Sequence, residues 1–218
     1  TSNQSLVFLL PLAGLLIGAA YQRLGAPIRG GNDLVIDTIH DEGPKIPLRM
    51  FPMVLVGTVL THLFGGSAGR EGTAVQMGAS LADDFAHRLG LSPATRLQLL
   101  TAGVAGGFGS VFGTPVAGTV FALEFVVWGQ LQYRALVPAL TAAVIGDYVT
   151  VTVFGVSHTP YPRVEPIPLD PLLLGKWVAF AAAVALVSSA FIELTHRLKA
   201  FGARRLPGLA LRMFAGGI

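Results

Sequence analysis

Apolar segments that are short, or that glycine and proline interrupt, dominate this chain of 218 residues. Hydrophobic residues make up 52% of the sequence, and charged residues only 12%, which is about half the charge of a typical soluble domain. Inside a bilayer, backbone polar groups must bond to each other, and broken backbone is tolerated only where it is buried in protein or lines a cavity. The sequence therefore predicts an all-α, polytopic membrane protein with short, tilted, discontinuous helices around a pathway.

Glycine, proline or charged residues separate the apolar segments from one another. The segments expected to be helical are 5–21, 50–64, 73–89, 97–112, 115–128, 135–154 and 171–195. The spacing of Gly14 and Gly18 suits close helix contact. Residues 155–170 contain four prolines and are expected to form an irregular loop. Five basic residues within 196–212 place that stretch on the cytoplasmic side.

Residues 65–78 form the most unusual stretch, because an Arg70–Glu71 pair stands among four glycines just before a predicted helix. Thr73 is the expected N-cap of that helix. The N-terminus of a helix attracts anions through its free N–H groups and its dipole. Glu71 places a titratable carboxylate there, where it can act as a gate or couple transport to protons. Pairing with Arg70, or capping of the helix, is the structural alternative.

A second glycine-rich helix start, Gly30-Gly31-Asn32-Asp33, precedes a short amphipathic segment that ends near His40. Both helix starts can point at one anion. Asn32 offers an NH₂ donor, with a helix cap as the alternative. Glycines at the two starts allow the backbone to approach an ion, or serve packing alone. These glycines are Gly30, Gly31, Gly69 and Gly72.

Other polar residues near these breaks have less defined roles. Arg70 can offer its backbone N–H to the ion, and Gln76 can orient the loop. Thr73 can line the pathway with its hydroxyl instead of capping the helix. Glu124 stands among apolar residues, where it needs a structural partner or serves as a proton relay.

Cofactor and nucleic-acid functions find no support in the sequence. The five histidines are scattered, and a single Glu-x-x-His spacing at Glu193 and His196 is a weak metal signal. No basic run alternates with aromatic residues, as nucleic-acid binding would require. We therefore expect no metal, no cofactor and no nucleic-acid partner.

Three stretches resemble the CLC family of chloride channels and transporters. Residues 69–78, GREGTAVQMG, resemble the family's GREGPxxQxG signature. Residues 30–33 fall where the family has its GSGIP anion-binding loop, and residues 112–124, FGTPVAGTVFALE, resemble its FNAPLAGxLFALEE stretch. By this resemblance Glu71 is the gating glutamate, whose carboxylate occupies an anion site until protonation releases it.

Departures from the family pattern resemble the fluoride/proton antiporter branch, CLC-F. Thr73 stands where most of the family has proline, and Asn32 stands near the serine that binds chloride. Phe125 replaces the second glutamate that proton-coupled chloride exchangers often have.

The family resemblance also implies an architecture. Each subunit has two halves of inverted topology, and two subunits form a homodimer. Residues 1–218 are expected to be one transmembrane domain, truncated at both ends, that covers most of the first half and the start of the second.

The leading hypothesis is fluoride export coupled to proton import across a bacterial inner membrane. The expected partners are fluoride or chloride ions, protons and the lipid bilayer. The alternatives are a passive chloride or anion channel and a chloride/proton exchanger of the same fold. A membrane hydrolase using Glu71 and His62 lacks a nucleophile or metal set, and a purely structural protein leaves the charge of Glu71 unexplained. We therefore expect a transporter rather than an enzyme.

Overall fold

The computed structural model describes residues 4–28, 30–40, 45–126, 133–158, 170–206 and 208–216. Regular structure within these ranges is entirely helical, with no strand, which confirms the predicted all-α class. The α-helices are α1 (Leu10–Leu24), α2 (Asn32–His40), α3 (Met50–Leu63), α4 (Arg70–Arg88), α5 (Pro93–Phe112), α6 (Pro115–Val126), α7 (Leu136–Tyr148), α8 (Pro171–Arg205) and α9 (Leu209–Ala215). Short 3₁₀ turns flank α1 and precede α7, and a π-helical turn, Val149–Val153, extends α7.

Within the described ranges, three helical stretches are long and apolar enough to cross a membrane, namely Leu6–Leu24, Tyr133–Val153 and Pro171–Arg205. The helices Met50–Leu63 and Pro115–Phe125 are apolar but shorter. This mixture of full and short helices agrees with the predicted discontinuous pattern. Most of the predicted proline-rich loop, residues 159–169, lies outside the described residues.

Small residues bring the central helices α4, α5 and α7 into close contact. A Cβ atom on Gly78 of α4 would collide with the carbonyl oxygen of Gly103 on α5. Four residues further along α5, a Cβ atom on Gly107 would collide with the carbonyl oxygen of Ala74. Backbones approach this closely only where side chains are absent or small. The glycines of residues 97–112 therefore serve packing of the helices that carry the candidate site.

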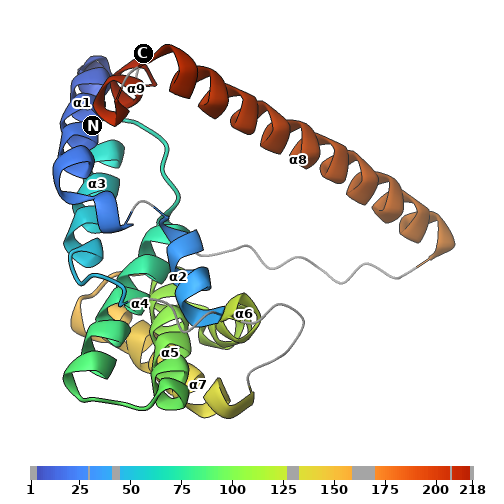
Figure 1. Ribbon diagram of the computed structural model, residues 1–218. Coiled ribbons are helices and arrows are strands. Elements are labelled where there is room, and N and C mark those ends of the chain that lie inside the picture. The colour runs from blue at the N-terminus through green and yellow to red at the C-terminus, as the bar shows by residue number, and fades with distance from the viewer. Residues whose placement is uncertain are drawn as a thin grey trace.

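The predicted contact through Gly14 and Gly18 is present between α1 and α9. A Cβ on Gly14 would collide with the carbonyl oxygen of Met213, and one on Gly18 would lie 2.5 Å from Cα of Ala210. Segments from opposite ends of the chain thus lie side by side (Figure 1).

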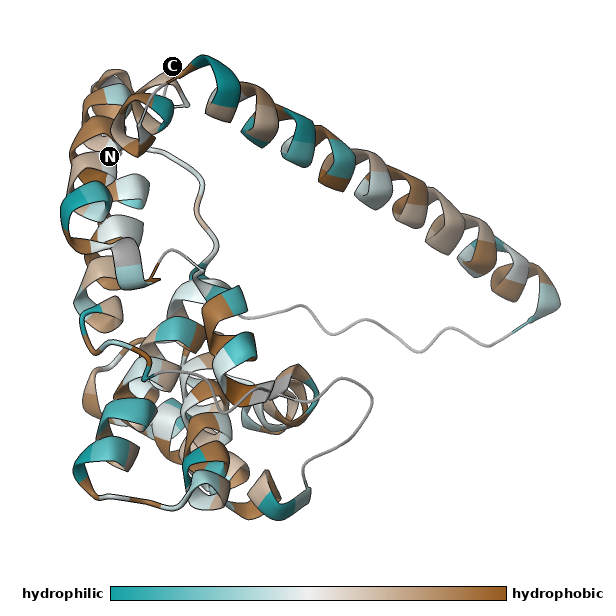
Figure 2. Cartoon of the chain, viewed as in Figure 1, coloured by the Kyte–Doolittle hydropathy of each residue, from teal (hydrophilic) through white to brown (hydrophobic). Residues whose placement is uncertain are grey.

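The long helix α8 extends away from the other helices (Figure 1), and none of its residues is buried. Figure 2 shows hydrophobic residues along much of its length. Large apolar side chains such as Trp177 and Phe180 are exposed on it. An apolar helix of this length requires lipid or protein around it, in keeping with a membrane location.

The turn between α5 and α6 follows the predicted glycine–proline break. Gly113 adopts the left-handed conformation, with φ of 67°, that ends α5, and Pro115 opens α6. A Cβ on Gly113 would also collide with the ring of His158. His158 in turn lies 2.9 Å from Asp147, measured from Nε2 to Oδ1, so this pair fastens the end of α7 to the turn.

Candidate anion site

The starts of α2 and α4 lie next to each other. Asn32 is the first residue of α2, and α4 begins at Arg70 after Gly69, which has the extended conformation of an N-cap. The Nδ2 atom of Asn32 lies 3.0 Å from the position that a Cβ on Gly72 would occupy. The structure thus brings together the two glycine-rich breaks that the sequence singled out.

A hydrogen bond between side chains joins the two helices at this point. Gln76 on α4 donates from Nε2 to Oδ1 of Asn32 over 2.9 Å. Gly31, with φ of 57°, makes the turn into α2 in a conformation that favours glycine. A Cβ there would lie 3.4 Å from Nε2 of Gln76, so Gln76 packs against the turn itself.

The carboxylate of Glu71 folds back over the residue that precedes α4. Its Oε2 atom lies 2.8 Å from the position that a Cβ on Gly69 would occupy. The side chain is exposed and forms no hydrogen bond or ion pair with the described residues. The same is true of Arg70, so the Arg70–Glu71 ion pair considered as an alternative is not formed in this part of the chain.

The prediction that Thr73 caps the helix is wrong. Gly69 is the N-cap, because residues 70–72 already have helical conformations, so Thr73 lies in the fourth position of α4. Its hydroxyl lies 2.6 Å from the hydroxyl of Thr58 on α3 and 3.2 Å from the carbonyl oxygen of Gly69. Thr73 therefore links α4 to α3.

The electrostatics at these helix starts favour an anion. Since Gly69 has no side chain, no side-chain cap satisfies the first N–H groups of α4. The helix dipole adds a partial positive charge at the same end. Glu71, in the first turn, is the acidic group placed to interact with both.

Glu124 stands apart from this cluster. It lies near the end of α6, its side chain is exposed, and it forms no hydrogen bond with the described residues. The expectation of a partner applied to a buried carboxylate, and exposure removes that need. The neighbouring Phe125 packs against Phe121, with ring centroids 5.2 Å apart.

Asp83 is a residue whose importance the sequence did not reveal. Its side chain is fully buried and accepts hydrogen bonds from Ile46 N at 2.6 Å and from Arg96 Nε at 2.5 Å. Asp83 lies seven residues after Gln76, which is two turns along the same helix face. Gln76 therefore bonds to the start of α2, and Asp83 bonds to Ile46, in the segment between α2 and α3. The partners of Asp83 come from elsewhere in the chain, Ile46 from the segment before α3 and Arg96 from α5, so the local sequence carries no signal for them.

Asp84, next to it, binds two cations at the polar end of α4. Lys45 Nζ lies 2.7 Å from Oδ1, and Arg88 Nε lies 2.5 Å from Oδ2. The hydrogen bond from Lys45, assisted by the one from Arg88, holds the pKa of the Asp84 carboxyl below its ordinary value, against the opposing effect of desolvation.

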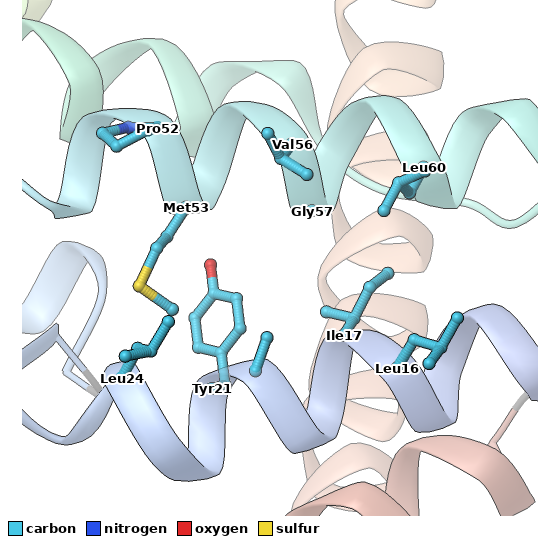
Figure 3. Close-up of a pocket in the computed structure, with 10 residues that line it drawn as sticks. Leu16, Ile17, Tyr21, Leu24, Pro52, Met53, Val56, Gly57 and Leu60 are labelled. Carbon is cyan, nitrogen blue, oxygen red and sulfur yellow. The ribbon is translucent and has the colours of Figure 1, made fainter.

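Two cavities with a mainly apolar lining lie between helices of the described part of the chain. The smaller, of about 300 Å³, lies between α1 and α3, where the Tyr21 ring projects from α1 toward α3 (Figure 3). Its lining residues are uncharged and almost wholly apolar, which does not suit an ion. The larger, of about 850 Å³, is lined by residues of α3, α4 and α5 that include Thr58, Arg70 and Thr73. Among the residues that the structure describes, no group of three or more His, Cys, Asp or Glu residues could hold a metal ion.

Comparisons with known proteins place this arrangement in a family. The model of the family "Voltage gated chloride channel" matches residues 13–218. A chloride/fluoride channel protein of Pseudomonas syringae pv. tomato is 46% identical over 212 residues, which cover 97% of this chain and 47% of that protein. An H(+)/Cl(-) exchange transporter, ClcA, of Salmonella arizonae is 28% identical over 73% of this chain and 34% of its own length.

A solved structure supports the same relationship. The crystal structure of a CLC-type fluoride/proton antiporter superposes with a TM-score of 0.89 at 34% identity, covering 98% of this chain and 53% of that one. The chain thus spans about half the length of these two relatives. Its matched residues, helical fold and glycine-rich helix starts show that the chain belongs to the voltage-gated chloride channel, or CLC, family.

Proposed function

We propose that this protein exports fluoride in exchange for protons, with Glu71 as the gate of the anion pathway. The observation that carries the proposal is the Glu71 carboxylate in the first turn of α4, which has no partner among the described residues, on a turn whose Gly72 lies against the Asn32 amide at the start of α2. The ionised carboxylate competes with a free anion for the donors at these helix starts. Protonation removes its charge, so that an anion takes its place and the proton travels with the side chain.

The preference for fluoride rests on sequence and on similarity. Asn32, Thr73 and Phe125 are the departures from the chloride-transporting pattern that resemble the fluoride branch. The solved relative at 34% identity is described as a CLC-type fluoride/proton antiporter. Fluoride is small and strongly hydrated, so it demands donors at close range. Backbone N–H groups of Gly69, Arg70 and Gly72, together with the Asn32 amide, supply such donors.

We also propose where the protein resides and how it assembles. Residues 1–218 form part of one transmembrane domain, comprising most of the first inverted half and the start of the second. The protein resides in a bacterial inner membrane as a homodimer and acts as a transporter rather than an enzyme. Its partners are the transported ion, protons and lipid.

Two relatives favour second candidates within the same fold. The Pseudomonas relative is named a chloride/fluoride channel, which favours passive anion conduction. The Salmonella relative is named an H(+)/Cl(-) exchange transporter, which favours chloride as the substrate. The experiment below separates both candidates from fluoride/proton exchange.

The test uses the full-length protein reconstituted into liposomes with a fluoride or chloride gradient. We expect the fluoride gradient to drive uphill proton movement, and the variant Glu71→Gln to abolish this coupling. Glu193→Gln is the matched control, because Glu193 is exposed on α8 and pairs with Arg197. Anion flux without proton movement would support a channel, and coupling driven only by chloride would support the chloride exchanger. Unchanged coupling in Glu71→Gln would refute the assigned role of Glu71.

A further inference from the structure

The side-chain amide of Asn32 is held in one of its two orientations. An amide has a donor end and an acceptor end, and only the donor end attracts an anion. Gln76 donates from Nε2 to the acceptor atom, Oδ1, of Asn32 over 2.9 Å. The donor atom, Nδ2, then lies on the side of Gly72, 3.0 Å from the position of an added Cβ. The donor end of Asn32 therefore lies nearer to Gly72 than the acceptor end does, since Oδ1 is 3.6 Å from the same position.

Gln76 is well placed to impose this orientation. It lies on α4 four residues after Gly72, so both residues occupy the same helix face. The turn at Gly31 leaves room for it, since even a Cβ there would lie 3.4 Å from Nε2. The side chain of Asn32 forms no other hydrogen bond with the described residues, so the bond from Gln76 is the contact that distinguishes the two ends of the amide.

We propose that Gln76 is a positioning residue that sets the anion selectivity of the site by fixing the orientation of the Asn32 amide. The inference rests on the proposed function in taking an anion at the helix starts as the transported species. With Oδ1 occupied by Gln76, the Asn32 NH₂ group faces the anion. With the amide reversed, the carbonyl oxygen would face the anion and repel it. A small anion, which its donors hold at close range, would lose the most binding affinity.

The variant Gln76→Glu tests this directly, because a carboxylate only accepts hydrogen bonds. It would draw Nδ2 of Asn32 toward itself and turn the carbonyl toward the anion. In the full-length protein in liposomes, we expect fluoride flux to fall at least about tenfold, and the fluoride-to-chloride flux ratio to fall with it. A tenfold change lies within the range of interaction energies between contacting residues. Gln98→Glu, on α5, makes the same chemical change without a described bond to Asn32 and is the control for added charge.

Repeating Gln76→Glu in an Asn32→Ser background separates orientation from charge. A serine hydroxyl rotates to donate in either direction, so no amide remains to be reversed. We expect the effect of Gln76→Glu on the flux ratio to shrink to about twofold or less in that background. An equal loss in both backgrounds would overturn the proposal, because Gln76 would then act through charge or folding alone.

An uncharged variant and a binding measurement test the same role of Gln76 independently of charge and of transport. Gln76→Leu removes the bond without adding charge, and it should lower the flux ratio only when Asn32 is present. Calorimetric titration of the purified protein with sodium fluoride reports the same loss of affinity without transport. If the unmodified protein moves anions without protons, the proposed exchange fails, while these comparisons still decide the role of Gln76. If exchange is intact and the Gln76 effects are independent of Asn32, only the inference fails.

Discussion

The hydroxyl oxygens of Thr58 on α3 and Thr73 on α4 lie 2.6 Å apart and share a hydrogen bond. Both residues are half-buried, and both also line the larger cavity between α3, α4 and α5. This bond connects the helix that carries Glu71 to the helix before it. Thr73 stands where most of the CLC family has proline, and a proline there could not form this contact because it has no hydroxyl.

Loss of either hydroxyl should therefore weaken the same contact. We expect Thr73→Val and Thr58→Val each to lower the free energy of unfolding by about 1 kcal/mol, because each leaves one hydroxyl without its partner. The double variant should lose less than the sum of the two, since the second change removes a hydroxyl that has already lost this bond. Unfolding of the purified protein in detergent measures this, and strict additivity would contradict the shared bond.

Gly69 should be required for the position of the Glu71 carboxylate. A Cβ at residue 69 would lie 2.8 Å from Oε2 of Glu71 and would displace this flexible side chain. We expect Gly69→Ala to retain anion flux but to lower the number of protons moved per anion, in the direction of Glu71→Gln. Gly175→Ala is the control, because a Cβ on Gly175 meets no atom within 4 Å. Coupling equal to that of the unmodified protein would show that the displacement does not matter.

Asp83 and Asp84 are adjacent carboxylates with different expected contributions to stability. Asp83→Asn removes the charge that a fully buried side chain presents to Arg96, which should destabilise the fold by about 3–5 kcal/mol. Asp84→Asn should cause a clearly smaller loss, because the side chains of Lys45 and Arg88 are 41% and 68% exposed and water screens these pairs. Chemical unfolding of both variants in detergent makes the comparison, and equal losses would argue against a special role for Asp83.

Asp84 should also make stability depend on acid pH. Its pKa is lowered in the folded state, chiefly by the hydrogen bond from Lys45, so the folded protein binds the proton less readily than the unfolded chain does. The resulting stabilisation is fully present above the ordinary Asp pKa of about 3.9, and it is lost as the pH falls through the lower folded value. Thermal unfolding of the protein and of Asp84→Asn from neutral to acid pH measures it. The variant should show a shallower acid-side decline, and identical profiles would assign that decline to other carboxylates.

Much of the fold could be predicted because the signals are local. Glycine at residue 113 and proline at residue 115 fix a helix end and a helix start through their own backbone preferences. The helix contact through Gly14 and Gly18 was also expected, although its partner α9 was not. The start of α4 was placed three residues late, because Gly72 suggested a break, whereas residues 70–72 continue the helix from Gly69.

The sequence and the tertiary structure also contributed different information about the candidate site. Glu71, Asn32 and Gln76 could be selected from the sequence, since polar residues at glycine-rich breaks in apolar segments are rare and seldom accidental. Their mutual arrangement could not, because Asn32 and Gln76 are 44 positions apart in the chain and meet only through packing of α2 on α4. Asp83 was missed for the same reason, since its partners Ile46 and Arg96 come from separate segments.

By itself, the sequence determined a helical membrane protein, the places where its helices break, and a carboxylate at one of those breaks. These properties follow from hydropathy, backbone preferences and charge, which act over a few neighbouring residues. Only the tertiary structure decided that Thr73 bonds to Thr58 rather than capping α4, and that Gln76 turns the NH₂ group of Asn32 toward Gly72. Such choices depend on which atoms of distant segments come within about 3 Å, and hydrogen bonds weaken steeply beyond that distance.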